Sequence, residues 1–333
     1  MAGACAGLRV VEVTRGMPGA LAGMLLADAG ADVIKAEGNA PDPYLTEPGF
    51  HLWNRGKLRV RADVGDDDAR ARIARLARWA DVVIVGVRPG TAERWGLTYD
   101  VLSATNPGLV VASVTGFGLT GPHRDAVASE AIVHALTGSM TSPLNGSLRD
   151  GPVFVAAHTA AYATAMLCAQ GILAALHTRE RTGRGQLVDV SLLDGILAYR
   201  GYGTMLPVEH KEDFPAAPPA REHRGLRPLF NINQCEDGRW ITVAAFTPAL
   251  AVKSLGVMGL HHLLADTRFV GMPNVFPDDA ARDAFLNILW DTFRTRPAEE
   301  WIRLFDDQGI PAEPVQTVDE FRNLGQLWAN DQA

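Results

Sequence analysis

No Asp, Glu, Lys or Arg occurs between His158 and Arg179, and this uncharged stretch constrains the fold more than any other feature. It predicts a long helix that is buried on most of its sides. The helix is just long enough to cross a bilayer. However, Thr164, Gln170 and many alanines make it only weakly apolar, which favours a packed core helix over a membrane span. A helix this poor in charge requires a large protein around it.

The residues after this stretch return the chain to the surface and then to a sheet. The charged cluster 179–181 is followed by a turn at 182–185, whose glycines tolerate the positive φ angles found at helix C-termini. Residues 187–191 (LVDVS) have the apolar, β-branched character of a short strand. The predicted order is therefore a core helix, a glycine turn and a strand.

Composition excludes several classes of protein. With 333 residues, 47% of them hydrophobic, and a mean hydropathy of +0.02, the chain resembles a soluble globular protein with room for two domains. With a net charge of −7, the chain lacks the excess of basic residues with which proteins bind nucleic acid or an anionic membrane. Residues 1–7 lack the features of a signal peptide, and Cys5, Cys168 and Cys235 form no metal-spaced cluster. We expect a cytoplasmic protein without a metal site that binds neither nucleic acid nor membrane.

The N-terminal region alternates between strand and helix patterns. Residues 8–13 predict a largely covered strand, 20–29 a helix and 31–37 a second strand. Together they form a βαβ unit, which should be right-handed. The turn at 14–19 is not GxGxxG, so the dinucleotide fingerprint is absent. Arg15 follows the first strand, at the carboxyl end where α/β sheets bind ligands.

The alternation continues through the rest of the N-terminal half. Thr91 is predicted to cap a short helix, and 126–140 is predicted to be helical. Further strands are predicted at 58–62, 82–85, 109–114 and 187–191. The predicted fold class is α/β, with an open, mostly parallel, Rossmann-like sheet and a second, smaller α+β domain.

A proline-rich segment separates the two predicted domains. We divide the chain into a large domain at 1–206, a linker at 207–228 and a small domain at 229–333. In the small domain, 230–245 predicts a hairpin that turns at Asp237-Gly238. Aromatic side chains are spaced to line one apolar face of the helices that follow: Trp290, Phe293, Trp301 and Phe305.

Six sequence blocks resemble the family III CoA-transferases, the CaiB/BaiF group that includes formyl-CoA transferase, carnitine CoA-transferase and α-methylacyl-CoA racemase. The blocks occur in the family's order and cover nearly the whole chain. They are LRVVEVTRGMPG (8–19), LLADAGADVIKAE (25–37), NRGK (54–57), ADVVIVGVRPGTAERWGL (80–97), TGFGLTGP (115–122) and GILAALHTRERTGRGQLVDVSLLD (171–194). The resemblance implies that CoA passes between carboxylic acids, as an acyl-CoA substrate and not as a resident cofactor. It also implies a dimer of two interlocked chains.

The resemblance further implies that CoA lies on the large domain, across the ends of the strands. Arginine suits this place because its fork of donors fits a phosphate group. The residues that match positions around CoA in the family are Arg15, Met17, Val87, Arg88, Arg94 and Trp95.

The chain departs from the family at the positions that carry the chemistry. The transferases use an aspartate nucleophile ten residues before the glycine of the GILAAL block, and here that position is Ala161. The racemases pair that aspartate with a histidine and a nearby glutamate, and these positions are Ser129 and Thr247. Alanine, serine and threonine cannot perform either chemistry. The nearest substitutes are Glu130 and His158.

Both residues can be catalytic or purely structural, and the sequence does not decide between the two roles. His158 is either a base or nucleophile, or a helix-start residue. Glu130 is either catalytic, or complements a helix dipole. Two classes of function therefore remain: an acyl-CoA enzyme, including a racemase or isomerase, and a non-catalytic CoA-binding subunit of an active paralogue.

The C-terminus adds an expectation about assembly. Family members usually continue with a segment that returns from the small domain to the large one, whereas this sequence stops at Ala333. We expect that segment to be absent or truncated and an apolar face of the large domain to lie open. A second chain, either a copy or a longer paralogue, is then expected to cover that face.

Overall fold

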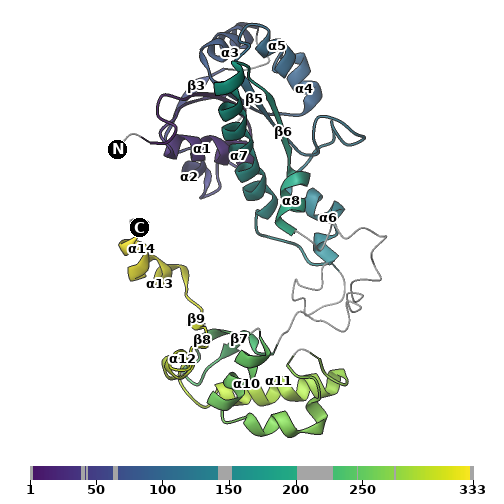
Figure 1. Ribbon diagram of the computed structural model, residues 1–333, viewed down its shortest axis with the longest axis vertical. Coiled ribbons are helices and arrows are strands. Elements are labelled where there is room, and N and C mark those ends of the chain that lie inside the picture. Colours follow the sequence, from purple (N-terminus) through teal and green to yellow (C-terminus); the bar gives the residue numbers. More distant parts are fainter. Residues whose placement is uncertain are drawn as a thin grey trace. The chain divides into compact units, whose positions relative to one another are not determined.

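The chain forms two compact units, which we describe separately (Figure 1). The computed structural model describes residues 3–38, 42, 44–62, 67–141, 152–200, 228–245, 247–273 and 275–330. The first unit contains the described residues up to 200 and the second those from 228 onward. The predicted linker 207–228 lies, apart from its last residue, outside the described residues, and the domain boundaries stay a prediction.

The first unit is built on a six-stranded sheet whose hydrogen-bonded neighbours all run parallel. The strands are β1 (Arg9–Thr14), β2 (Asp32–Glu37), β3 (Lys57–Arg61), β4 (Val82–Gly86), β5 (Val110–Thr115) and β6 (Leu187–Ser191). Their order is β3-β2-β1-β4-β5-β6. This is the doubly wound order, in which the chain reverses its direction across the sheet between β1 and β4. The predicted fold class is confirmed.

Helices cover both faces of this sheet because alternate strand residues face opposite sides. Val10 and Ile84 pack in a core with α1 (Met17–Asp28), α7 (Thr159–Thr182) and α8 (Leu192–Arg200). Val11 and Val83 pack in a second core with α3 (Asp67–Trp79), α4 (Pro89–Arg94) and α5 (Tyr99–Ser103). Among the described residues, this unit also has the short helices α2 (Phe50–Trp53), α6 (Glu130–Leu136) and η1 (Ser139–Thr141).

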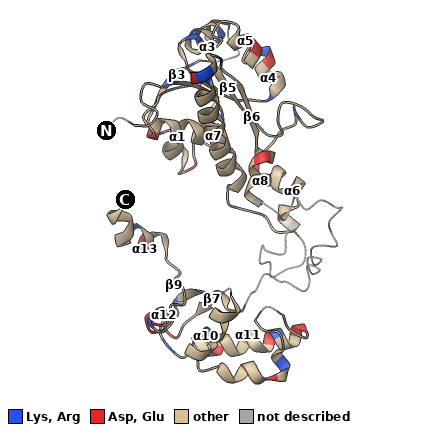
Figure 2. Cartoon of the chain, in the orientation of Figure 1, with Lys and Arg blue, Asp and Glu red and all other residues tan. Residues whose placement is uncertain are grey.

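Helix α7 is the long uncharged segment of the sequence, and Figure 2 shows it without charged residues along most of its length. It ends at Gly183, which adopts the predicted left-handed conformation (φ 69°). By length and composition alone it passes a test for a membrane span, yet it packs against α1, α8 and two strands as a core helix. The expectation that most of its sides are buried is wrong. Tyr162, Met166 and Leu173 are each nearly half exposed because none of the described elements of this unit covers that stripe.

Three helices begin at residues other than those predicted, and the local turn explains each difference. Helix α1 begins three residues earlier than predicted, because Pro18 presets the helical φ angle in its first turn. Thr91 lies inside α4, whose N-cap is Arg88. The helix predicted over 126–140 is the shorter α6, because the side chain of Ser129 caps its start.

The second unit has a small antiparallel sheet of order β7-β8-β9. The predicted hairpin is confirmed as β7 (Phe230–Gln234) and β8 (Trp240–Ala244), while β9 (Ala312–Pro314) was not predicted. Three of the four predicted aromatic residues are fully buried, and Trp290 is half-buried. The helices are α10 (Pro248–Val257), η4 (His261–Ala265), η5 (Thr267–Phe269), α11 (Asp279–Phe293), α12 (Ala298–Asp306), α13 (Val318–Arg322) and α14 (Gly325–Ala329).

Candidate functional site

A cavity of about 370 Å³ lies at the carboxyl ends of the central strands, and we call it the switch-point cavity. The strand order reverses between β1 and β4, so the loops after these strands diverge and leave a crevice. Its lining residues are Arg15, Gly16, Met17, Pro18, Tyr44, Gly86, Val87, Arg88, Val114, Thr115, Gly116, Ala126, Ala128, Ser129, Glu130, His158, Ala161 and Leu192. The structure thus brings together four of the six residues predicted around CoA and both candidate catalytic residues.

The turn after β1 shapes one wall of this cavity. Gly16 has a φ of 86°, which favours glycine, and a Cβ atom there would lie 3.2 Å from the Tyr44 ring. The Gly16 N–H donates to Asp42 Oδ2 (3.2 Å), so a carboxylate completes the start of α1. Burial raises the pKa of Tyr44, and the nearby Glu130 and Asp42 carboxylates act in the same direction. The phenol therefore remains a proton donor at the cavity wall.

Glu130 is the first residue of α6, and its carboxylate binds the start of α7. Its Oε1 accepts hydrogen bonds from Ala160 N (2.6 Å), and its Oε2 accepts one from Ala161 N (3.0 Å). The first N–H groups of a helix lack partners within the helix. The Glu130 carboxylate therefore complements a helix start. That helix is α7, in addition to α6, which begins at Glu130 itself.

His134 is the functional-site neighbour that the sequence reasoning missed. Its Nε2 lies 3.1 Å from Glu130 Oε1 and 3.2 Å from Thr159 Oγ1. The side chain is 2% exposed, and its Nδ1 has no hydrogen-bond partner in the described part of the chain. The tautomer that carries its proton on Nε2 can donate to Glu130. The i, i+4 spacing of Glu130 and His134 was the available signal.

The other residues that the resemblance matches to catalytic positions are arranged as follows. His158 is the N-cap residue of α7, makes no side-chain capping bond and faces the cavity as an exposed imidazole. Ala161 presents only a methyl group there and is 4% exposed. Ser129 caps α6 by accepting from Ile132 N. The lining of the cavity thus contains one carboxylate, which accepts from two backbone N–H groups and contacts His134, and one imidazole.

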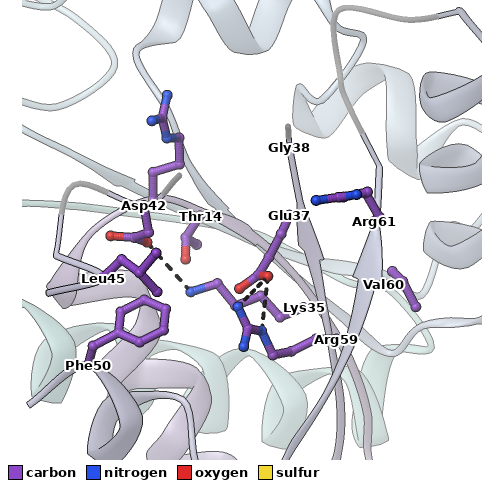
Figure 3. A pocket seen from close by; sticks show the side chains of 11 residues that line it. Thr14, Lys35, Glu37, Gly38, Asp42, Leu45, Phe50, Arg59, Val60 and Arg61 are labelled. Atoms are coloured by element: carbon purple, nitrogen blue, oxygen red, sulfur yellow. Dashed lines mark hydrogen bonds and ion pairs between the residues drawn. The ribbon is translucent and has the colours of Figure 1, made fainter. Parts of the chain in front are cut away.

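A second cavity of about 420 Å³ lies at the carboxyl ends of β1, β2 and β3, and we call it the cationic cavity (Figure 3). Arg15 lines both cavities. Lys35, Arg59 and Arg61 were not among the predicted site residues. The two arginines are two positions apart on β3, so they share one face of that strand. The lining consists of Thr14, Arg15, Lys35, Glu37, Gly38, Asp42, Leu45, Phe50, Arg59, Val60 and Arg61.

Three predicted residues lie elsewhere. Arg94, at the end of α4, donates to Thr91 Oγ1 (3.0 Å), and Trp95 packs against the second core. Neither lines the two cavities described above. Thr247 caps α10 in the second unit by accepting from Leu250 N. The CoA contacts inferred for Arg94 and Trp95 stay predictions.

Comparison with known proteins identifies the relatives of this chain. Residues 5–332 match the model of CoA-transferase family III. A succinyl-CoA–D-citramalate CoA-transferase of Chloroflexus aurantiacus is 31% identical over 94% of this chain and 78% of its own length. An acetyl-CoA:oxalate CoA-transferase of Acetobacter aceti is 32% identical over 98% of this chain and 84% of its own length. A succinyl-CoA–L-malate CoA-transferase alpha subunit of Chloroflexus aurantiacus is 29% identical over 95% of this chain and 75% of its own length.

The solved structures agree. A CAIB/BAIF family protein from Brucella suis superimposes with a TM-score of 0.78 at 27% identity, covering 99% of this chain and 88% of that one. The protein Rv3272 of Mycobacterium tuberculosis gives a TM-score of 0.79 at 28% identity, with 99% and 87% covered.

Proposed function

The chain belongs to CoA-transferase family III, and we propose that it binds CoA or an acyl-CoA thioester across its two cavities. The observation that carries this proposal is that Arg15 lines both of them. The thioester end lies in the switch-point cavity, whose walls are mostly small and apolar. The phosphate-bearing end lies on the cationic cavity, where arginine forks match phosphate oxygens.

The identity of residue 161 argues against self-contained CoA transfer. By resemblance it occupies the nucleophile's position, and a methyl group cannot form an acyl anhydride. Glu130 is the neighbouring carboxylate, but both of its oxygens are bound by backbone N–H groups. We therefore infer a CoA-binding chain that works in the cytoplasm beside a catalytically complete paralogue.

A second candidate is transfer of CoA between carboxylic acids, or racemisation, by Glu130 and His158. It is favoured by one observation: both side chains line the cavity that receives the thioester. Incubation with acetyl-CoA or succinyl-CoA followed by hydroxylamine separates the candidates, because hydroxylamine traps an activated acyl group on the protein. We expect no trapped group on the wild type and a measurable one on Ala161→Asp. Acyl transfer by the wild type that Glu130→Gln or His158→Ala abolishes would establish the second candidate instead.

Binding itself is tested by calorimetry. A charge-assisted hydrogen bond contributes roughly 1.5–3 kcal/mol, so Arg15→Ala should weaken CoA binding at least about tenfold. Arg184→Ala, which removes an exposed arginine in the turn after α7, is the matched control and should leave affinity unchanged. The resemblance predicts the same tenfold loss for Arg94→Ala, whereas the geometry places Arg94 outside both cavities. Unchanged affinity in Arg15→Ala would refute the proposed site.

The open stripe on α7 supports a proposal about assembly. Tyr162 and Met166 are one helical turn apart, and Leu173 continues the same face. We propose that a second chain, a copy or a paralogue, covers this face. Obligate interfaces bury on the order of 2,000–5,000 Å². Light scattering is expected to show dimers or aggregates for the isolated chain; a monodisperse monomer at micromolar concentration contradicts the proposal.

A further inference from the structure

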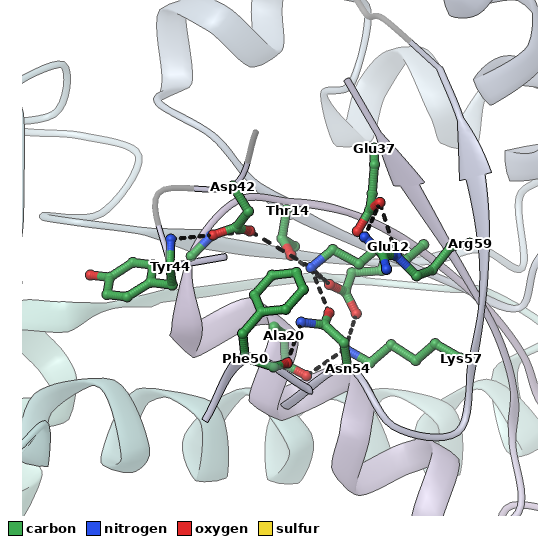
Figure 4. A network of polar contacts seen from close by, with 12 residues as sticks. Glu12, Thr14, Ala20, Glu37, Asp42, Tyr44, Phe50, Asn54, Lys57 and Arg59 are labelled. Atoms are coloured by element: carbon green, nitrogen blue, oxygen red, sulfur yellow. Dashed lines mark hydrogen bonds and ion pairs between the residues drawn. The ribbon is translucent and has the colours of Figure 1, made fainter. Parts of the chain in front are cut away.

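A network of charged side chains extends from strand β1 to the loop that carries Tyr44 (Figure 4). Glu12 of β1 pairs with Lys57 of β3 (2.7 Å) and with Lys35 of β2 (3.3 Å), and these three side chains are 0%, 0% and 1% exposed. Lys35 also pairs with Asp42 (4.0 Å), whose side chain is 12% exposed. Two ammonium groups and two carboxylates therefore balance each other, as buried charges require.

Asp42 passes this fixed position on to Tyr44. Its Oδ1 accepts from Tyr44 N (2.9 Å), and its Oδ2 accepts from Gly16 N (3.2 Å). The tyrosine ring is seated on Gly16, where a Cβ atom would lie 3.2 Å from it. The ring also contacts the edge of the Trp53 ring, with 5.9 Å between the centroids and 78° between the planes. Both the backbone and the ring of Tyr44 are therefore held in place.

The hydroxyl of Tyr44 has no task inside the described part of the protein. Figure 4 shows it at the far end of the ring from the charged network, and Tyr44 lines the switch-point cavity. Among the residues that the structure describes, this hydroxyl has no hydrogen-bond partner. Burial raises the pKa of Tyr44, with the carboxylates of Glu130 and Asp42 acting in the same direction, so the proton stays on the oxygen at neutral pH. A half-buried phenol usually finds a partner, and here that partner can be a ligand.

The other uncharged donors of the cavity are already engaged. The first N–H groups of α7 donate to Glu130. The hydroxyls of Thr115 and Ser129 are oriented by backbone N–H groups of their own turns, from which they accept. Tyr44 is therefore the lining hydroxyl that is left without a bond in this part of the chain.

The charged or ionisable donors suit a different kind of ligand atom. Arg15, Arg88 and His158 line the cavity as exposed side chains. A guanidinium in contact with water matches an anionic oxygen. A neutral, half-buried hydroxyl instead matches a neutral carbonyl oxygen, and a hydrogen bond is stronger where water is excluded.

We propose that Tyr44 is a specificity-determining residue that donates a hydrogen bond to the thioester carbonyl oxygen of an acyl-CoA, and that Asp42 is the positioning residue that holds it at the cavity wall. The inference rests on the proposed function, in which the thioester end lies in the switch-point cavity. It gives this chain a means to distinguish a loaded acyl-CoA from CoA with a free thiol, because only the thioester offers a carbonyl acceptor.

Two ligands that differ only at this carbonyl test the proposal. Acetyl-CoA carries the carbonyl, and its thioether analogue ethyl-CoA has a methylene group in its place. Calorimetry should show that the wild type binds acetyl-CoA about threefold to tenfold more tightly than ethyl-CoA. Tyr44→Phe keeps the ring and should lose this preference, with its affinity for ethyl-CoA unchanged. The matched control is Tyr99→Phe, which removes a hydroxyl that donates to the Gly185 carbonyl outside both cavities; it should keep the preference.

Infrared spectroscopy adds a readout that a purely structural role of Tyr44 would not change. With acetyl-CoA isotope-labelled at the thioester carbonyl, the carbonyl stretch should move to lower frequency on binding to the wild type. The shift should be absent in Tyr44→Phe and smaller in Asp42→Ala, which releases the Tyr44 backbone.

The outcomes separate this inference from the proposed function. A wild type that binds both ligands equally, or a folded Tyr44→Phe that keeps the preference or the carbonyl shift, overturns the role of Tyr44 while acyl-CoA binding stands. A full shift in Asp42→Ala overturns the role of Asp42. Absence of binding of either ligand by the wild type overturns the proposed function and this inference together.

Discussion

The two units of this chain bury their interiors in opposite ways. The first packs alanines and valines on a parallel sheet and includes the buried triad of Glu12, Lys35 and Lys57. The second fills its interior with aromatic rings, among them Phe293 and Trp301 at 5.5 Å between ring centroids. Apolar packing is non-directional, whereas buried charges need particular partners at particular distances. The comparison teaches that the unit with the switch-point and cationic cavities is the one that holds paired charges in its interior.

The first prediction concerns removal of the buried carboxylate from the first unit. Glu12→Gln removes the carboxylate that Lys35 and Lys57 share and leaves only Asp42, 4.0 Å from Lys35, as a partner. Removing one partner of a buried ion pair costs about 3–5 kcal/mol. We expect the first unit to unfold at much lower denaturant and CoA binding to disappear with it. The buried thiol of Cys168, whose pKa burial raises to about 12, is a reporter of this unit because it reacts only after unfolding.

The control for this prediction is the double variant Glu12→Gln with Lys57→Met, which removes one charge of each sign. It should recover part of the lost stability. If Glu12→Gln alone unfolds like the wild type, the triad does not hold the first unit, and the contrast between the two interiors fails.

The second prediction breaks the aromatic interior. Trp301 is 1% exposed, stacks on Phe305 and donates from Nε1 to the Phe293 carbonyl (2.8 Å). Its truncation to alanine should destabilise the second unit by about 3–5 kcal/mol. The reporter is Cys235, whose pKa is raised by burial to about 11. Cys235 should become reactive at lower denaturant while Cys168 stays protected.

Trp301→Phe provides the matched control, because it keeps a ring and loses only the indole donor; its effect should be clearly smaller. Simultaneous exposure of Cys168 and Cys235 in Trp301→Ala would show that the two units unfold together. The two units would then unfold as one cooperative body.

The same contrast explains what the sequence could and could not predict. Runs such as LRVVEV and ADVVIV specify buried parallel strands, so the fold class followed from periodicity. The spaced aromatics of the second unit predicted its core for the same reason. Charged partners were not predictable in this way. Lys35 lies in an apolar run and gives no sign that it meets Glu12 and Lys57, because strand order, and not sequence distance, brings them together.

The candidate site, too, has residues that the sequence could predict and residues that it could not. Arg15 and Arg88 both line the switch-point cavity, because residues after β1 and β4 meet where the strand order reverses. Their contacts with CoA stay predictions. The bond of Glu130 to the start of α7 was not predicted, because it joins residues 30 positions apart in two different helices and no periodicity indicates it. His134 had a signal in its spacing from Glu130, yet only the structure shows the carboxylate between it and α7.

The third and smallest prediction compares surface carboxylates of the two units at acidic pH. Burial acts to raise the pKa of Asp81, but hydrogen bonds from Arg9 outweigh it, so the pKa lies below its usual value. In the second unit, hydrogen bonds from Arg268 lower the pKa of Asp266 to about 2. A depressed carboxylate pKa stabilises the folded state above the unfolded pKa, near 3.9, and that contribution is lost as pH falls through the folded value.

Asp81 also contacts Arg179 at the end of α7 (3.2 Å), so its pairing joins β1, the start of β4 and the core helix. Asp266 pairs only locally with an exposed Arg268, where solvent screens the interaction. We therefore expect Asp81→Asn to lower stability by about 1 kcal/mol at pH 7, the upper end for partly exposed pairs, and Asp266→Asn to lower it less. Urea unfolding at pH 7, 5 and about 3 checks this: each difference from the wild type should shrink on acidification. An Asp81→Asn difference that stays constant with pH would mean that packing, and not charge, gives Asp81 its effect.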